Sequence, residues 1–514
     1  MKIQYQKIEN GLEILRIWQD SGIIKVPEQI EGIPVIRIAP YTFSLHKDEE
    51  EKNASLMQIE GLLNILNDAK EYGSLLNVED YDWELLEKFV ENTDTESQIS
   101  FETYGLDETA EQLKRLIRIG KVMAQKYEIV ATNPPYAGTS NLSAKVNNFV
   151  KKNYPDSKAD LFAVFIERCG EMLKKNGYQA MITQHAWMFL SSFEKLRVKL
   201  QQQTIVNMAH LGARAFEEIG GEVVQTVSFV MLKRGENRYK GVYCRLLEPT
   251  TQKGKEEMFL KGENQYEAIQ DHFGKIPGGP VAYWISDTIR SIFEKFKRLD
   301  EIATPKRGMC TCGNELFYRF WHEISYIEFC DPLFCRDHDG WVPLNKGGEY
   351  RKWYGNLWEV VDWKNNAERL RQYPTAQIKN EEFYFTPAIT WSSLTTGNLS
   401  FRYTGDGFIF DQASNGVFPE GDKYYYYIAF LNSKITVLLL NIINPSMNVL
   451  VGDIASLPII FDNDYKETID MLVESSIEIC KIDWNSYEIS WDFCKHPLMP
   501  QREEEGITIF AGMK

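Results

Sequence analysis

The chain has 514 residues and a formal net charge of −16, with 57 Lys and Arg against 73 Asp and Glu. Its apolar fraction of 44% and charged fraction of 25% are ordinary for globular protein, and the length suits roughly two to four domains. The acidic balance argues against a general polyanion binder, although it leaves room for a local basic face. No run reaches about 18 uncharged apolar residues, and eight cysteines suit a reducing compartment, so we predict a cytoplasmic protein without a membrane span.

The front of the chain combines a β-type and a helical stretch. Residues 1–46 contain short β-type runs separated by Gly and Pro, and VPEQIEGIPVIRIAPYTFS resembles one unit of a BspA-type leucine-rich repeat. A single unit cannot bury its own apolar face, so a repeat fragment and a stray β segment both stay open. Residues 47–126 are predicted to be helical, because Leu62 and Leu66 follow helical spacing before a stop at Gly73.

The middle of the chain alternates strands and helices. Within residues 127–250, the runs YEIVAT, GYQAMIT, TIVNMAHL and VVQTVSFVMLKR favour strands, and SKADLFAVFIERCGEMLKKNG favours a helix that stops at Gly177. This pattern predicts an α/β fold with part of a Rossmann-like, doubly wound sheet. Residues 236–276 are polar and are predicted to form a linker or a peripheral excursion. Residues 277–460 have many aromatic residues and turn signals, which predict an α+β or mostly β domain, followed by a helical tail at 461–514.

The four residues Asn133, Pro134, Pro135 and Tyr136 directly follow the strand YEIVAT. Ligands of α/β sheets bind beyond the carboxyl ends of strands. The prolines lack N–H groups and have a fixed φ, so the carbonyls of this loop point outward, and the side chain of Asn133 adds an acceptor. Two such acceptors suit the N6 amine of an adenine that has left the helix stack, and Tyr136 can stack on its ring. The alternative is an ordinary turn.

The motif resembles the catalytic motif of N6-adenine DNA methyltransferases, and the downstream stretches keep that family's order. DSKADLFAVFIERC, NGYQAMITQHAWMFLSSFEKLR and GARAFEEIGGEVVQTVSFVML resemble its later sheet motifs. WVPLNKGGEYRKWYGN, NEEFYFTPAITW and NVLVGDIASLPI resemble its target-recognition region. Over roughly residues 60–460, the chain resembles the C-terminal half of the PglX-type methyltransferases of BREX phage-defence systems.

This resemblance implies transfer of a methyl group from S-adenosylmethionine to adenine N6 in double-stranded DNA, alongside other phage-defence proteins. Asn133 and Pro134 would accept hydrogen bonds from the amine of the flipped base, on which Tyr136 would stack. The resemblance places Asp160 near the cofactor pocket, although Asp160 could equally be an acid in the first turn of a helix. Residues 277–460 would be an α+β target-recognition domain.

The expected cofactor loop is missing from the front of the chain. In the family, a Gly-x-Gly loop that allows close approach of backbone to S-adenosylmethionine precedes the Asn-Pro-Pro-Tyr motif. Residues 1–126 contain no Gly-x-Gly. We therefore expect an unpaired edge on the strand at 127–132, and either poor solubility or a partner chain that supplies the missing half. Two hypotheses stay open: a methyltransferase fragment that is inactive alone, and a non-catalytic DNA-recognition subunit.

Further candidates lie in the second half. Basic residues beside glycines and aromatic rings suit a DNA-contacting loop, and a solvated turn is the alternative. The loop residues are Lys346, Arg351, Lys352, Trp353 and Tyr354.

The spacing of the cysteines does not match the usual Cys-x2-Cys pattern of zinc sites, so no metal is predicted. The residues considered are Cys310, Cys312, Cys330 and Cys335, with His322 and His338. His185 and Trp187 follow the second strand and are candidates for the base pocket, or for structural roles.

Overall fold

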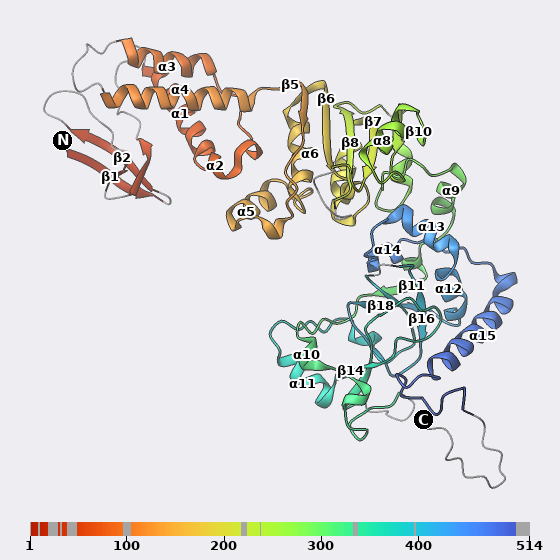
Figure 1. Cartoon of the computed structure of the whole chain (residues 1–514). Helices are drawn as coiled ribbons and strands as arrows, with labels where there is room; N and C mark the ends of the chain where they lie inside the picture. Colours follow the sequence, from red (N-terminus) through yellow and green to blue (C-terminus); the bar gives the residue numbers. More distant parts are fainter. Residues whose placement is uncertain are drawn as a thin grey trace, which may run out of the picture. The chain divides into compact units, whose positions relative to one another are not determined.

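The computed structural model divides the chain into two compact units, which are described separately. The first consists of Met1–Trp187 and Lys195–Gln270, and the second of Met188–Glu194 and Asp271–Lys514 (Figure 1). The residues that the structure describes are 2–8, 11–18, 29–30, 33–38, 49–95, 104–216, 224–236, 238–332, 338–394 and 397–499. Within these ranges no single helix is long and apolar enough to cross a membrane, and one bent pair, Tyr424–Leu431 with Lys434–Ile443, meets that criterion together.

A small sheet forms the start of the first unit. Its strands β1 and β2 pair antiparallel, β2 and β4 pair parallel, and the order is β1-β2-β4-β3. The β-type runs expected in residues 1–46 are therefore confirmed, whereas the repeat interpretation stays a prediction. The bounds are β1 (Lys2–Ile8), β2 (Gly11–Trp18), β3 (Gln29–Ile30) and β4 (Ile33–Ile38).

Helices follow, as the sequence predicted. Helices α1, α3 and α4 run beside one another (Figure 1) and enclose a core that includes Leu62, Phe89 and Ile117. Gly73 adopts a φ of +53° and ends the short α2 rather than α1, which stops earlier. The bounds are α1 (Glu49–Leu66), α2 (Ala69–Tyr72), η1 (Gly73–Leu75), α3 (Trp83–Thr95) and α4 (Tyr104–Ala124).

The main sheet of the first unit has six strands in the order β10-β9-β7-β8-β6-β5. Strands β5 and β6 are parallel, and β8 runs antiparallel to both β6 and β7. All four strands expected in residues 127–250 are present, in a mixed sheet. The bounds are β5 (Tyr127–Thr132), α5 (Ala144–Asn153), α6 (Leu161–Met172), β6 (Leu173–Gln184), η3 (His185–Met188), α7 (Glu194–Leu200), β7 (Thr204–Gly212), β8 (Thr226–Leu232), β9 (Lys240–Arg245), α8 (Gln252–Leu260) and β10 (Gln265–Ile269).

Two expectations for this region are wrong. Gly177 does not end a helix but lies inside β6, where a Cβ atom would come within 2.9 Å of the carbonyl oxygen of Glu128 on the neighbouring β5. Of the two alternatives for residues 236–276, the linker is wrong, because β9 and β10 extend the sheet through them, whereas their place at the end of the strand order is compatible with a peripheral excursion. Tyr243 on β9 is completely buried, and the charged residues that suggested a linker lie largely around it in turns and on α8.

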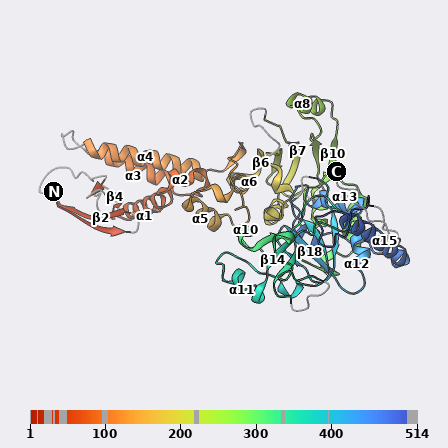
Figure 2. The ribbon, with the colours of Figure 1, turned by 60° about the horizontal axis from the view of Figure 1, so that its bottom comes forward.

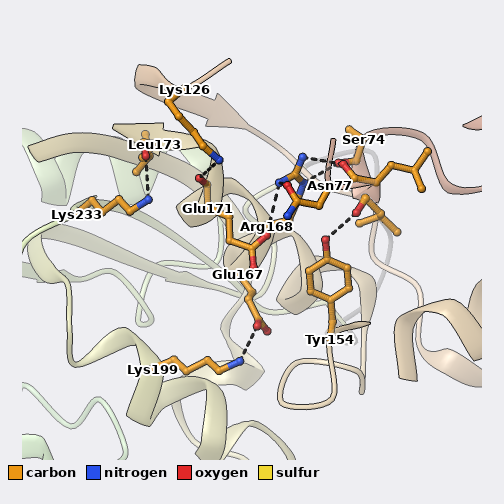
Figure 3. Close-up of polar contacts among 12 residues, drawn as sticks. Ser74, Asn77, Lys126, Tyr154, Glu167, Arg168, Glu171, Leu173, Lys199 and Lys233 are labelled. Carbon is orange, nitrogen blue, oxygen red and sulfur yellow. Dashed lines mark hydrogen bonds and ion pairs between the residues drawn. The ribbon is translucent and has the colours of Figure 1, made fainter. Parts of the chain in front are cut away.

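Arg168 on α6 fastens the turn after α2 to that helix (Figure 3). Its buried guanidinium donates hydrogen bonds to the carbonyl oxygen of Leu76 at 2.7 Å and to the side-chain oxygen of Asn77 at 3.1 Å. The hydroxyl of the buried Tyr154 donates to the carbonyl oxygen of Leu75 at 2.7 Å. Since a buried carbonyl without a partner is costly, these bonds fix the turn after α2 against α6.

The second unit contains two four-stranded sheets, with orders β11-β18-β15-β16 and β12-β14-β13-β17. Trp391 and Leu440 lie in one core, Leu344 and Val361 in another, and α15 packs along α12 (Figure 2). This arrangement confirms the α+β expectation. The strands are β11 (Ala303–Lys306), β12 (Tyr318–Phe320), β13 (Trp341–Asn345), β14 (Glu359–Asp362), β15 (Ala388–Ser392), β16 (Phe401–Thr404), β17 (Ile409–Phe410) and β18 (Ser414–Pro419). The helices are α9 (Asp287–Lys295), α10 (Asn314–Phe317), α11 (Lys364–Gln372), α12 (Tyr424–Leu431), α13 (Lys434–Ile443), α14 (Val451–Ala455) and α15 (Lys466–Trp484).

Candidate nucleotide-binding site

The Asn-Pro-Pro-Tyr loop begins where β5 ends, at the carboxyl edge of the main sheet. Asn133 and Pro135 are exposed, Pro134 is buried, and Tyr136 is half-buried. The loop thus anchors itself through Pro134 while the amide of Asn133 faces solvent. An exposed acceptor on a proline-stiffened backbone is suited to receive a ligand without first rearranging.

The ring of Tyr136 is held from two sides. Its hydroxyl donates to the carbonyl oxygen of Ile182 on β6 at 3.2 Å, and the edge of Phe162 meets it with the ring centroids 6.1 Å apart and the planes at 83°. Burial raises the pKa of Tyr136 to about 12. The phenol therefore stays neutral throughout the physiological range and presents a positioned, uncharged aromatic surface beside Asn133.

Asp160 connects the loop to α6. Its carboxylate caps the helix by accepting from the backbone N–H of Phe162 at 3.2 Å, and it also accepts from the N–H of Ala137 at 3.0 Å. The N–H of Leu161 returns a bond to the carbonyl oxygen of Ala137 at 3.0 Å. Burial raises the pKa of Asp160, and the surrounding N–H groups oppose that shift. Asp160 is thus a helix cap, and a role toward a cofactor stays a prediction.

A histidine pair lies at the same edge of the sheet. Nδ1 of His185, just beyond β6, is 2.8 Å from Nε2 of His210 near the end of β7. Burial lowers the pKa of His185 to about 4 and the pKa of His210 well below its ordinary value, so both rings are neutral at neutral pH. His210 was not recognised from the sequence, although its position near the carboxyl end of a parallel strand was an available signal. Trp187 is buried and donates to the hydroxyl of Thr183 at 3.2 Å, which favours its structural role.

The three basic residues of the expected DNA-contacting loop each have a partner within the second unit. Lys346 lies 3.0 Å from the carboxylate of Glu359, and Arg351 lies 2.9 Å from that of Asp483. The ammonium of Lys352 donates to a backbone carbonyl at 2.8 Å. The side chains of Lys346 and Arg351 are each 31% exposed, so contact with a phosphate would have to compete with these carboxylates.

The two aromatic residues of this loop pack inward. The backbone N–H of Trp353 donates to the carbonyl oxygen of Phe401 at 2.9 Å, and its half-buried ring packs on the core around Trp391. Burial raises the pKa of Tyr354, whose ring lies against both this core and the cluster around Trp484. A contact of either ring with DNA stays a prediction.

The sulfur atoms of Cys310 and Cys312 lie 3.2 Å apart. Within the described ranges, no group of three or more His, Cys, Asp or Glu side chains could hold a metal ion. Cys335, which entered the zinc hypothesis, lies outside the described residues.

The expected site for S-adenosylmethionine beside β5 stays a prediction. In the described part of the chain β5 pairs with β6 alone, so no strand lies on its other side. The sequence before β5 has no Gly-x-Gly through which a backbone could approach the cofactor closely. Among the described residues, the Asn-Pro-Pro-Tyr loop is present and no second strand lies beside β5.

An α/β sheet that carries Asn-Pro-Pro-Tyr at a strand end, followed by a unit of sheets and helices, is the arrangement that the sequence predicted for an amino-methyltransferase. Residues 36–216 match the model of the Eco57I restriction-modification methylase family. The chain is 40% identical over 450 residues to the adenine-specific methyltransferase PglX of Lacticaseibacillus casei (strain Zhang), covering 84% of this chain and 37% of that protein. It is 36% identical over 446 residues to the adenine-specific methyltransferase BrxX of Escherichia coli O9:H4 (strain HS), covering 86% and 36% respectively. Over most of its length the chain is therefore similar to PglX/BrxX-type adenine-specific methyltransferases, the resemblance that the motif order predicted, and it spans little more than a third of these relatives' length.

Two of the solved structures to which the chain is weakly similar are restriction-modification enzymes. The Type IIL enzyme MmeI in complex with DNA is 10% identical, with a TM-score of 0.46 over 86% of this chain and 65% of that chain. The ATP-dependent Type ISP enzyme LlaBIII bound to DNA is 11% identical, with a TM-score of 0.39 over 76% and 31%.

Proposed function

We propose that this chain is the adenine-holding and DNA-recognising part of an N6-adenine DNA methyltransferase that uses S-adenosylmethionine and serves phage defence. The relatives support the adenine specificity, since both are named adenine-specific methyltransferases. The observation that carries the proposal is the pairing of an exposed Asn133 with the restrained ring of Tyr136 at the carboxyl end of β5.

Each residue of the loop has a defined role toward the base. The side-chain oxygen of Asn133 and the carbonyl oxygen of Pro134 accept the two hydrogens of the N6 amine, which draws the nitrogen lone pair out of conjugation with the ring. Tyr136 stacks on the flipped adenine and offsets part of the cost of leaving the helix stack. Pro135 keeps the backbone from turning inward. Asp160 positions the loop through Ala137, whatever its relation to a cofactor.

The second unit supplies the contacts to duplex DNA. Lys346, Arg351 and Lys352 would neutralise phosphates, while Trp353 and Tyr354 support the loop that carries them. Two glycines in this loop, Gly347 and Gly348, have φ values of +88° and +135°, which allow a tight course that other residues would resist. Residues 277–460 are accordingly proposed to be the target-recognition domain.

The chain by itself is proposed to be inactive in methyl transfer. The open edge of β5 and the absent Gly-x-Gly support this, and they equally favour the second candidate, a recognition subunit that never catalyses. The two differ in one outcome. If the chain is a methyltransferase fragment, it methylates DNA through Asn133 once the cofactor-bearing half is added. If the chain is a recognition subunit, it does not.

The base-holding role is tested without any cofactor. Binding to a duplex with one unpaired adenine is compared, by fluorescence polarisation, with binding to a duplex with one unpaired thymine. We expect a preference for adenine that is lost in Asn133→Ala and kept in Asn207→Ala, an exposed asparagine on β7 of the same sheet. Equal binding of the two duplexes by the unaltered chain would remove the proposal.

The inactivity of the isolated chain is tested by incorporation of labelled methyl groups from S-adenosylmethionine into bacterial DNA. We expect none. Robust incorporation that disappears in Asn133→Ala would show that the cofactor site is complete after all.

A further inference from the structure

A short segment of the second unit carries two thiols on the same side of the chain. Residues 309–313 lead from β11 to α10, and Thr311 in their middle is 1% exposed. Because alternate side chains of an extended segment point to opposite sides, the two neighbours of Thr311 face away from the core. These are Cys310, which is half-buried, and Cys312, which is exposed. Neither thiol has a part in the proposed function.

The backbone holds these two thiols together. The N–H of Cys310 donates to the carbonyl oxygen of Gln377 at 2.9 Å, and the N–H of Gln377 donates to the carbonyl oxygen of Cys310 at 2.8 Å. Cys312 has a φ of +53°, a left-handed conformation that residues other than glycine seldom adopt. With this backbone the two sulfur atoms lie 3.2 Å apart and share a hydrogen bond. A covalent bond between them therefore needs no movement of distant segments.

A glutamine side chain distinguishes the two sulfur atoms. Nε2 of Gln412 donates to the sulfur of Cys310 at 3.1 Å, and Oε1 of the same amide accepts from the guanidinium of Arg307. Because arginine only donates, the amide must keep its oxygen toward Arg307 and its NH₂ group toward the sulfur. A thiolate accepts such a hydrogen bond more strongly than a thiol does, and the thiolate is the nucleophilic form of cysteine. The arrangement therefore favours Cys310 as the nucleophile.

Cys312 is placed as the second thiol of the pair. Its hydrogen bond with Cys310 raises the pKa of Cys312, burial adds to this shift, and a hydrogen bond with Thr375 opposes it. Cys312 thus keeps its proton and donates it toward Cys310. A thiol in this position can attack its neighbour once the neighbour has been oxidised.

We propose that Cys310 and Cys312 form an oxidisable dithiol, a modification site at which a hydroperoxide converts the two thiols into one disulfide. The thiolate of Cys310 first attacks the terminal oxygen of the hydroperoxide, the O–O bond breaks, and Cys310 becomes a sulfenic acid while water or an alcohol leaves. The sulfur of Cys312 then attacks that of Cys310 and gives up its proton to the departing hydroxide, which leaves as water. With hydrogen peroxide, two thiols and one peroxide give one disulfide and two waters.

Peptide mapping tests this proposal on the whole chain. Trypsin is expected to release residues 308–319 as one peptide that contains both thiols, since they lie between Arg307 and Arg319. The chain is treated with hydrogen peroxide, alkylated with iodoacetamide and digested. We expect the peptide to lose the mass of two hydrogen atoms and to escape alkylation, whereas the exposed Cys494 is still alkylated. Dithiothreitol is expected to restore alkylation of the peptide.

Two serine variants separate the roles of the thiols. Cys312→Ser removes the second thiol, so oxidation is expected to stop at a sulfenic acid on Cys310, which dimedone traps. Cys310→Ser removes the nucleophile, and Cys312 is then expected to react no faster than Cys494. Serine is close to cysteine in size and neither position is buried, so circular dichroism should show unaltered folding.

The glutamine is tested by the rate of disulfide formation. Gln412→Leu removes the donor to Cys310 and is expected to slow the reaction at least about fivefold at neutral pH, because a hydrogen bond to a charged group is lost. The deficit should shrink at a pH that ionises the thiols without help, which a general loss of structure would not produce. Gln377→Leu is the matched control, since Gln377 pairs with Cys310 through its backbone and its side chain is exposed. This control is expected to react like the unaltered chain.

Three results would overturn the proposal. The first is a peptide 308–319 that keeps both thiols free under conditions that oxidise Cys494. The second is a disulfide between two chains on a non-reducing gel in place of the internal one. The third is a Gln412→Leu variant that forms the disulfide as fast as the unaltered chain, which would contradict Cys310 as the nucleophile.

Discussion

The carboxylate of Asp160 accepts a hydrogen bond from the backbone N–H of Ala137 at 3.0 Å, across 23 positions of the sequence. The same carboxylate caps α6, so one side chain fixes both the start of that helix and the end of the Asn-Pro-Pro-Tyr loop. The geometry of the Asn-Pro-Pro-Tyr loop therefore depends on a residue that lies outside the motif.

The first prediction separates the two roles of Asp160. Asp160→Ala removes the cap and the bond to Ala137, and is expected to lower the free energy of unfolding by about 1–2 kcal/mol. Asp160→Asn keeps an acceptor and is expected to retain most of the stability. Urea denaturation measures both. If Asp160→Asn is as unstable as Asp160→Ala, the carboxylate charge matters more than the acceptor.

The same pair of variants addresses the cofactor. In the complex with the complementing chain, a purely structural Asp160 predicts that Asp160→Asn binds S-adenosylmethionine normally by isothermal titration calorimetry. A loss of that binding at unchanged stability would assign Asp160 to the cofactor pocket.

The second prediction concerns Arg351, whose guanidinium is paired with Asp483 and lies over the ring of Trp484 at 5.1 Å. Arg351→Ala with Lys352→Ala is expected to weaken duplex binding and to reduce its dependence on salt, because fewer counterions are released. Titrations of a fluorescent duplex at several salt concentrations measure both quantities.

Arg371 provides the matched control, since it is ion-paired with Glu381 and lies over the ring of Trp363 at 5.9 Å. Arg371→Ala is expected to leave DNA binding unchanged. A complementary variant, Asp483→Asn, frees Arg351 and should tighten binding by up to about fivefold, the range of exposed ion pairs. Unchanged affinity and salt slope in the double variant would remove the loop from the DNA interface.

The third prediction is a pH dependence centred on Asp411 in the second unit. This carboxyl is 3% exposed and accepts from the N–H of Ala413 at 2.7 Å, and burial raises its pKa to about 7 from an ordinary value of 3.8. A carboxyl with a raised folded pKa holds its proton more tightly in the folded state. Its contribution to stability is therefore complete below the unfolded pKa, near 4, and is lost as the pH rises through about 7.

As the pH rises from 5.5 to 8, the unaltered chain is expected to lose about 2 kcal/mol of unfolding free energy that Asp411→Asn does not lose. Urea denaturation at the two pH values gives the difference, and Asp406→Asn at an exposed position serves as control. A pH dependence that is the same with and without Asp411 would contradict the raised pKa.

The fourth prediction concerns Arg168. Replacing its guanidinium leaves the carbonyl oxygens of Ser74 and Leu76 without their donor, so Arg168→Met is expected to cost about 3–5 kcal/mol. Tyr154→Phe, which loses a single bond, should cost about 1 kcal/mol. Arg234→Ala, at a position 51% exposed, is the control and should stay near neutral. Protease cleavage in residues 69–79 should rise in the order of these costs.

The sequence predicted correctly those elements whose residue pattern lies within one continuous segment. The run YEIVAT predicted β5 with its observed bounds, and Asp160 marked the start of α6. The polar composition of residues 236–276 was misleading, because β9 enters the sheet through pairing with β7, more than 30 positions earlier in the sequence. The basic residues of the recognition loop could be named, but the pairing of Arg351 with Asp483 spans 132 positions and has no local signature.

The amino-acid sequence by itself determined the motif order, the Asn-Pro-Pro-Tyr loop and the lack of a Gly-x-Gly before it, since each depends on residue types in a continuous stretch. The tertiary structure decided that Asp160 fastens this loop, that His185 lies beside His210, and that β5 is the edge strand of the main sheet among the described strands. Those relationships depend on which strands pair and in which register, and pairing is set by contacts between segments that the sequence keeps apart.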